Sequence, residues 1–121
     1  MVGEMTMAGL SPQDGEREMA KLLQVKIKPT AVVCGSDAVA SGAARAILQA
    51  GLKIPDDISL TGLGDGDLAK HGPVPLTTVG FGNMGKAGFE LWMAIREGGE
   101  MKPRVVGCEL IDRGSTAKVG T

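Results

Sequence analysis

The stretch that most constrains the fold is TAVVCGSDAVASGAARAILQAG, residues 30–51, which predicts a strand, a polar corner and a helix. Its β-branched, apolar beginning, residues 30–34, predicts a strand buried on both faces. The Ala-rich remainder predicts a helix that opens at Ser36 or Asp37 and stops at Gly51, where glycine can adopt the left-handed conformation. A strand that leads at once into a helix is typical of α/β folds, so we expect the rest of the chain to be organised around this unit.

Ser36 and Asp37 form the corner between the predicted strand and helix. In open α/β sheets, ligands bind at the carboxyl ends of parallel strands, where helices begin. Both side chains can equally well cap the helix by accepting hydrogen bonds from its first N–H groups. The sequence therefore leaves two interpretations of this corner open, a ligand contact and a helix cap.

Composition and charge narrow the class of protein. At 121 residues the chain is long enough for one domain, and its 43% hydrophobic content argues against disorder. A formal net charge of −1, with the basic residues scattered, gives no indication that this chain itself binds nucleic acid. No apolar run reaches membrane-spanning length and no secretory leader is evident, so we expect a cytoplasmic protein without a membrane partner.

The remaining pattern predicts alternating strands and helices. Ser11, Pro12 and Asp14 resemble a capping box at the start of a helix that ends near Gln24. Residues 62–75 are Gly- and Pro-rich, which predicts a long irregular loop. Strands are expected at residues 2–9, 58–63, 76–79 and 104–111, a further helix at 83–97 and a polar tail at 112–121. This order predicts an α/β fold with a mostly parallel sheet and helices on both faces.

Three segments resemble the carboxyl-terminal part of the lac-repressor and galactose-repressor family of bacterial transcription regulators. They are PTAVVCGSDAVASGAARAILQAGLKIPDDISLTGLGD, PLTTVGFG and ELIDRGSTA, and the likeness runs from Gly9 to Ala117. It implies a periplasmic-binding-protein-like (type I) sensor of two α/β subdomains with a small effector between them. Residues 1–121 would be the carboxyl-terminal portion of this effector-binding and dimerisation domain. We expect the chain to lack the helix-turn-helix, which binds operator DNA, and most of the first subdomain.

The resemblance also implies which residues face the effector, expected to be a sugar or related metabolite. Ser36 and Asp37 stand where many relatives have Asn-Asp, so the carboxylate is kept and a hydroxyl replaces the amide. Gly64 and Asp65 stand where relatives have two aspartates, so the first carboxylate is absent. The residues expected at the effector wall are Leu10, Ser36, Asp37, Gly64, Asp65 and Phe81.

Two of these positions are apolar. A separate stretch is expected to form the interface between two copies of the chain. Leu10 matches a position that is often an aromatic stacked on the effector, and Phe81 matches a polar or aromatic position of the hinge strand. The resemblance further implies a homodimer, with a dimer face formed by residues 39–50 and 58–63.

Other chemically notable residues have simple interpretations. Cys34 and Cys108 lie in predicted strands without metal-ligand spacing, so buried thiols are favoured over a disulfide. Asp65 and Asp67 lack the further oxygen ligands of a cation loop, so no metal is expected. Trp92 lies at helical spacing beside apolar residues, which favours a packing role. No cofactor-binding motif is present.

The sequence bears on three functional classes. Effector sensing in a transcription regulator follows from the resemblance. A fragment of a periplasmic or transporter-linked sugar-binding protein is the alternative, because such proteins share the fold. An enzyme is not expected, because no nucleophile, base and oxyanion set can be assembled and the single histidine, His71, lies in a Gly- and Pro-rich stretch.

Overall fold

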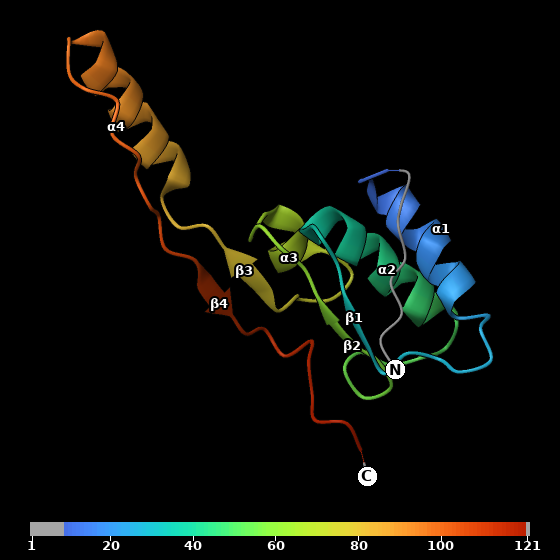
Figure 1. Cartoon of the computed structure of the whole chain (residues 1–121). Coiled ribbons are helices and arrows are strands. Elements are labelled where there is room, and N and C mark those ends of the chain that lie inside the picture. Colours follow the sequence, from blue (N-terminus) through green and yellow to red (C-terminus); the bar gives the residue numbers. More distant parts are fainter. Residues whose placement is uncertain (1–8, 121) are drawn as a thin grey trace.

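The computed structural model describes residues 9–120, which form a helix-covered body and a projecting arm (Figure 1). The strand predicted at residues 2–9 falls almost wholly outside the described residues. We name residues 81–108 the arm, and residues 9–80 with 109–120 the body. In order, the elements are α1 (Pro12–Leu22), β1 (Ala31–Val33), α2 (Asp37–Gln49), β2 (Ser59–Thr61), α3 (Asp67–His71), β3 (Thr78–Gly80), α4 (Met84–Arg96) and β4 (Glu109–Ile111).

The four strands form two small sheets rather than the mostly parallel sheet that was predicted. β1 pairs with β2 in parallel, and β3 pairs with β4 antiparallel. Isolated parallel bridges, Thr61 with Thr77 and Gly64 with Gly80, join the two pairs. The prediction was wrong because α4 does not cross back over the sheet after β3. The chain instead runs out along the arm and returns beside β3 in the opposite direction.

The core of the body lies between α2, α1 and one face of β1 and β2. α2 contacts α1, α3 and β2, and the apolar residues along one side of it, Val39, Ala43, Ala46 and Ile47, are buried. α1 and α2 approach closely at Gly42, where an added Cβ atom would overlap the carbonyl of Pro12. The fully buried large side chains here include Met19, Ile47 and Leu60. The capping box predicted at Ser11 is present, with hydrogen bonds in both directions between Ser11 and Asp14.

The strand β1 is covered on one face only. Val32 packs against the core, whereas Val33 on the opposite face is 84% exposed. On β4, Leu110 is 71% exposed. Within residues 9–120, no helix covers this second face, so the expectations of a doubly buried strand and of helices on both faces were wrong. A continuous apolar run becomes buried on both sides only where two helical layers are present.

The segment predicted to be an irregular loop contains a helix, and the predicted polar tail is held against the body. The loop at residues 62–75 contains the short helix α3, whose Ala69 is fully buried. The polar tail crosses back over the body, where Ser115 is 2% exposed. Its hydroxyl donates to the Leu60 carbonyl at 2.6 Å and accepts from the Thr77 N–H at 2.7 Å. The predicted strand at residues 104–111 is ordered as a strand only from Glu109.

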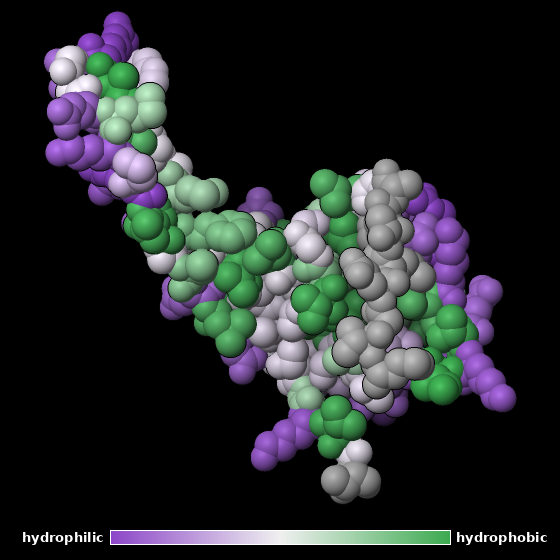
Figure 2. All heavy atoms as spheres, viewed as in Figure 1, coloured by the Kyte–Doolittle hydropathy of each residue, from purple (hydrophilic) through white to green (hydrophobic). Residues whose placement is uncertain are grey.

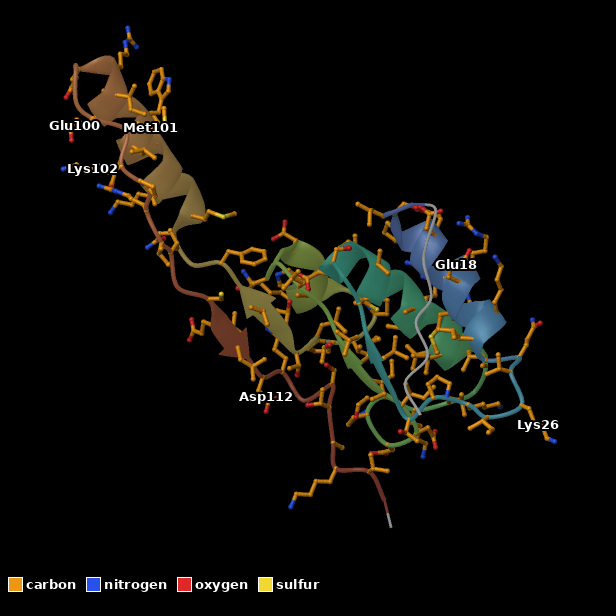
Figure 3. The ribbon with its side chains drawn as sticks, in the orientation of Figure 1. Glu18, Lys26, Glu100, Met101, Lys102 and Asp112 are labelled. Atoms are coloured by element: carbon orange, nitrogen blue, oxygen red, sulfur yellow. The ribbon has the colours of Figure 1, made fainter. Side chains whose placement is uncertain are left out.

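The arm is the least buried part of the structure. The bounds of α4 agree to within one residue with the range of 83–97 that was predicted, yet none of its residues is buried. Trp92 is 51% exposed, so the expectation that it packs in a core was wrong. Glu100, Met101 and Lys102 lie at the far end of the arm, where the chain turns back (Figure 3). No helix within residues 9–120 is long and apolar enough to cross a membrane.

Candidate functional site

Ser36 makes the helix cap that the sequence allowed. Its backbone is extended, with φ −158° and ψ 160°, because it continues the direction of β1 into the first turn of α2. Its hydroxyl oxygen accepts from the Val39 N–H at 3.2 Å. The hydroxyl hydrogen is therefore left to donate to another group, and the residue is half-buried at the corner.

Asp37 does not cap the helix but ties the ends of the neighbouring strands together. One carboxylate oxygen accepts from the Thr78 hydroxyl at 2.7 Å and the other from the Gly66 N–H at 2.8 Å. The Asp37 N–H donates to the Leu63 carbonyl at 3.0 Å. An added Cβ atom at Gly62 would overlap this carboxylate, so glycine is required there. At 6% exposure, Asp37 is a buried acceptor with both oxygens in use.

Asp65 is held by a basic residue that was not among the predicted site residues. It has a left-handed backbone, with φ 57°, and its carboxylate accepts from Arg113 at 2.5 Å. Arg113 also donates to the Leu76 carbonyl at 3.1 Å, and Lys70 lies 4.0 Å from Asp65. Local periodicity could not find this pair, because its partners are 48 positions apart. The only sequence indication was the RGST segment that contains Arg113.

The predicted residues that follow strands converge at one edge of the body. β1, β2 and β3 run in parallel, so Ser36, Gly64 and Phe81 all lie just beyond carboxyl ends of strands. The Gly64 N–H donates to the Val79 carbonyl at 2.8 Å, which places the end of β2 beside that of β3. Phe81 is 37% exposed there. Leu10 does not follow a strand. It is the residue before the Ser11 cap of α1 and is 75% exposed.

The two cysteines differ in environment, and both are free. Cys34 lies two residues before Ser36, and burial raises the pKa of its thiol to about 11, so the thiol is neutral near pH 7. Cys108 precedes β4 and is exposed, which corrects the expectation of a buried thiol in a strand. Within residues 9–120, no cluster of His, Cys, Asp and Glu is arranged to hold a metal ion.

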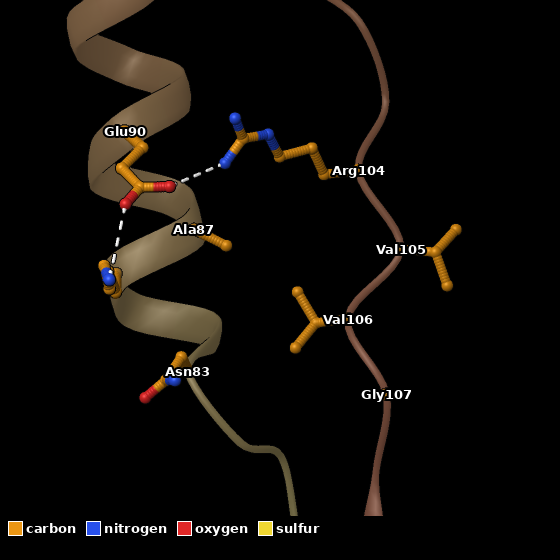
Figure 4. Close-up of a pocket in the computed structure, with 8 residues that line it drawn as sticks. Asn83, Ala87, Glu90, Arg104, Val105, Val106 and Gly107 are labelled. Atoms are coloured by element: carbon orange, nitrogen blue, oxygen red, sulfur yellow. Dashed lines mark hydrogen bonds and ion pairs between the residues drawn. The ribbon is translucent and has the colours of Figure 1, made fainter.

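A separate crevice of about 440 Å³ lies in the arm, between α4 and its return segment (Figure 4). Glu90 on α4 accepts from Arg104 on the return segment at 2.8 Å, and Lys86 lies 3.8 Å from the same carboxylate. The hydrogen bond from Arg104 is the main reason why the pKa of Glu90 lies below its usual value. This crevice is the seam that holds the arm together, and none of the predicted site residues lines it.

The stretch expected to form a dimer face is already largely covered within the chain. On α2, Val39, Ala43 and Ile47 are at most 5% exposed, and on β2, Leu60 is fully buried. Leu48 and Leu63 are the large apolar residues of this stretch that remain open, at 42% and 36% exposure. Packing by α1 and the sheet therefore leaves only a narrow strip of residues 39–50 for a partner.

The family pattern described as periplasmic binding protein-like domain matches residues 3–116. The transcriptional repressor CytR of Escherichia coli K12 is 37% identical over 106 residues, which cover 84% of this chain and 31% of the repressor.

Two solved structures are similar in fold. A LacI family regulator from Lactobacillus casei with bound glucose superposes with a TM-score of 0.74 at 28% identity, covering 88% of this chain and 40% of the regulator. The lac repressor dimer bound to operator and the anti-inducer ONPF superposes with a TM-score of 0.80 at 28% identity, covering 89% and 39%. The chain thus spans less than half the length of each of these relatives. It belongs to the periplasmic-binding-protein-like domain family, in the form found in LacI-type transcriptional regulators.

Proposed function

We propose that this chain forms one wall of the small-molecule effector site in a LacI-type transcriptional regulator. The observation that carries the proposal is the convergence of Ser36, Gly64 and Phe81 beyond the carboxyl ends of parallel strands, in a member of this family. This is the edge at which open α/β sheets bind ligands. The solved relative from Lactobacillus casei holds glucose, which supports a sugar or related metabolite as the effector class.

Within this wall, the carboxylates have a positioning role. Asp37 and Asp65 already accept hydrogen bonds from Gly66, Thr78 and Arg113. These bonds fix both carboxylates within the body, and Asp37 is itself only 6% exposed. We therefore assign the direct contacts to the Ser36 hydroxyl, the backbone at Gly64 and the Phe81 ring. Leu10 would contribute an apolar contact from the helical layer.

NMR titration of the ¹⁵N-labelled chain with glucose and other monosaccharides tests the proposal. Amide shifts should gather at Ser36, Gly64, Gly66 and Phe81, and Phe81→Ala should weaken binding. The chain has two phenylalanines, so Phe89→Ala in the arm is a matched control that should leave binding unchanged. Shifts gathered in the arm, or equal effects of the two substitutions, would refute the assignment.

Regulation of transcription is the proposed setting, and the cytoplasm the proposed location, because CytR is a transcriptional repressor. Operator binding would then reside in a helix-turn-helix outside residues 1–121. The alternative, a periplasmic or transporter-linked sugar-binding protein, is distinguished by the DNA upstream of the gene. An in-frame helix-turn-helix supports the regulator, and an in-frame secretory signal supports the alternative.

A further inference from the structure

Arg113 follows β4, and its backbone is fastened to the residue that precedes β3. Its N–H donates to the Thr77 hydroxyl at 3.1 Å. The same hydroxyl donates to the Asp112 carboxylate at 3.1 Å, and this carboxylate also accepts from the Gly114 N–H at 2.9 Å. Asp112 is labelled in Figure 3, where the chain leaves β4. These bonds fix the point from which the Arg113 side chain extends.

The guanidinium of Arg113 joins two segments that are separate in the sequence. One terminal nitrogen donates to the Leu76 carbonyl at 3.1 Å, and the other donates to the Asp65 carboxylate at 2.5 Å. The side chains of Arg113 and Asp65 are only 19% and 24% exposed, so water competes with this pair less than at an open surface. A planar guanidinium holds two acceptors in one fixed geometry, which a lysine ammonium does not. Arg113 thus connects the approach to β3 with the turn that follows β2.

Asp65 has a backbone conformation that needs support from its surroundings. Its φ of 57° is left-handed, and within residues 9–120 it is the one non-glycine residue with a positive φ. Aspartate tolerates this region better than most residues, but the conformation persists only where neighbouring contacts fix it. Lys70 lies 4.0 Å from the carboxylate and is 45% exposed, so it is the looser of the two basic partners. Arg113 is therefore the main group that holds this turn.

The turn that Arg113 holds carries two of the contacts assigned to the effector. Gly64 lies next to Asp65 and forms a parallel bridge with Gly80 of β3. Gly80 packs against Asp65 so closely that an added Cβ atom would lie 3.3 Å from the Asp65 Cβ atom. Phe81 follows Gly80 and begins the arm, and hydrophobic surface continues from the base of the arm onto the body (Figure 2). A displacement of Asp65 would therefore shift both the Gly64 backbone and the Phe81 ring.

We propose that Arg113 is a positioning residue of the effector wall, which acts through Asp65 on Gly64 and Phe81. This inference rests on the proposed function, because it concerns the same wall. The third direct contact, Ser36, is held separately, since its hydroxyl bonds within the first turn of α2. Loss of Arg113 should therefore disturb one side of the wall and leave the Ser36 side in place.

Titration of the 121-residue chain with glucose and other monosaccharides, followed by amide shifts, measures the effect on binding. For the monosaccharide that the parent chain binds most tightly, Arg113→Gln should weaken binding by about tenfold, as for the loss of one well-placed hydrogen bond. Arg104→Gln is the matched control, because Arg104 pairs with Glu90 at 2.8 Å in the arm, and it should leave the affinity unchanged. Equal affinities of Arg113→Gln and the parent, or equal weakening by both substitutions, would overturn this inference alone. A parent chain that binds no monosaccharide would overturn the proposed function as well.

A double-mutant cycle separates positioning from a general loss of stability. Asp65→Gly introduces a residue that adopts the left-handed conformation without support. In that background, Arg113→Gln should weaken binding by less than about twofold, because the turn no longer depends on the arginine. In the parent background, Arg113→Gln should shift the ligand-free amides of Gly64 and Phe81 but not that of Ser36. A tenfold loss in both backgrounds would indicate a general structural role and overturn the inference.

A second substitution covers the case in which Arg113→Gln does not fold, as judged by circular dichroism. Asp65→Asn removes the charge that holds Arg113, while the side chain keeps its shape and its tolerance for the left-handed conformation. It should weaken binding by about threefold, because a neutral acceptor holds the guanidinium less firmly than a carboxylate does. Unchanged affinity of a folded Asp65→Asn variant would overturn the inference.

Discussion

The body and the arm use similar amphipathic helices of equal length but differ in what covers them. α2 and α4 each span 13 residues. Nine residues of α2 are buried, whereas no residue of α4 is buried. The spacing of apolar residues thus gives a helix an apolar side. Whether this side is buried, and so contributes to the free energy of unfolding, depends on the elements that surround the helix. We expect substitutions in the body to affect the free energy of unfolding much more than equivalent substitutions in the arm.

The largest difference should come from one isoleucine in each helix. Ile47→Ala in α2 empties a fully buried site and should lower the free energy of unfolding by about 4 kcal/mol. Ile95→Ala in α4, where the side chain is 38% exposed, should cost less than about 1 kcal/mol. Urea denaturation at one low protein concentration measures both. Similar losses would mean that the arm is packed as firmly as the body.

The next effect concerns the buried carboxylate of the corner. Asp37→Ala leaves the Thr78 hydroxyl and the Gly66 N–H without their acceptor and should cost about 3 kcal/mol. Asp37→Asn keeps one acceptor oxygen and should cost roughly half as much. Both values come from the same denaturation experiment. A loss for Asp37→Ala of no more than about 1 kcal/mol would contradict the role of this carboxylate in joining the strand ends.

A smaller loss is expected where the carboxyl-terminal segment crosses the body. Ser115→Ala removes the hydroxyl that bonds to Leu60 and Thr77 and should cost about 1 to 2 kcal/mol. Thr116→Ala is a neighbouring control, because Thr116 is exposed, and should be nearly neutral. An identical, negligible effect of both substitutions on the urea midpoint would show that the segment is only loosely attached.

The smallest effect is the pH dependence of the α1 cap. Hydrogen bonds from Ser11, and then from Arg17, lower the pKa of Asp14 from 3.8 to about 2. Because the folded pKa is the lower one, this carboxylate stabilises the fold above about pH 4, and the contribution is lost as the pH falls towards 2. NMR titration should give the low pKa in the parent chain and a higher one in Ser11→Ala. A pKa near 4 in the parent would contradict the capping geometry.

Local sequence patterns predicted the parts of the fold that depend on neighbouring residues. The α1 capping box, the α2 helix with a cap at Ser36 or Asp37 and the bounds of α4 follow from short-range spacing. The pairing of Asp65 with Arg113 and the burial of Ser115 depend on contacts between distant positions, which no local pattern contains. The parallel sheet was overpredicted because strand direction depends on the path of the arm.

Of the residues expected at the effector wall, the corner residue Ser36 followed from its place at a strand end, whereas Gly64 and Phe81 were expected only from the family resemblance. The structure places these three at one edge, because parallel strands have their carboxyl ends together. The sequence left open whether Asp37 caps α2, and the structure gives that role to Ser36. Asp37 instead bonds across to Gly66 and Thr78, which spacing along the chain could not indicate.

Hydrogen exchange of individual backbone amides tests the contrast between body and arm most directly. Amides of α2 should exchange only on global unfolding, whereas those of α4 should exchange orders of magnitude faster. Equal protection of α2 and α4 would contradict the division of the molecule into a stable body and an uncovered arm.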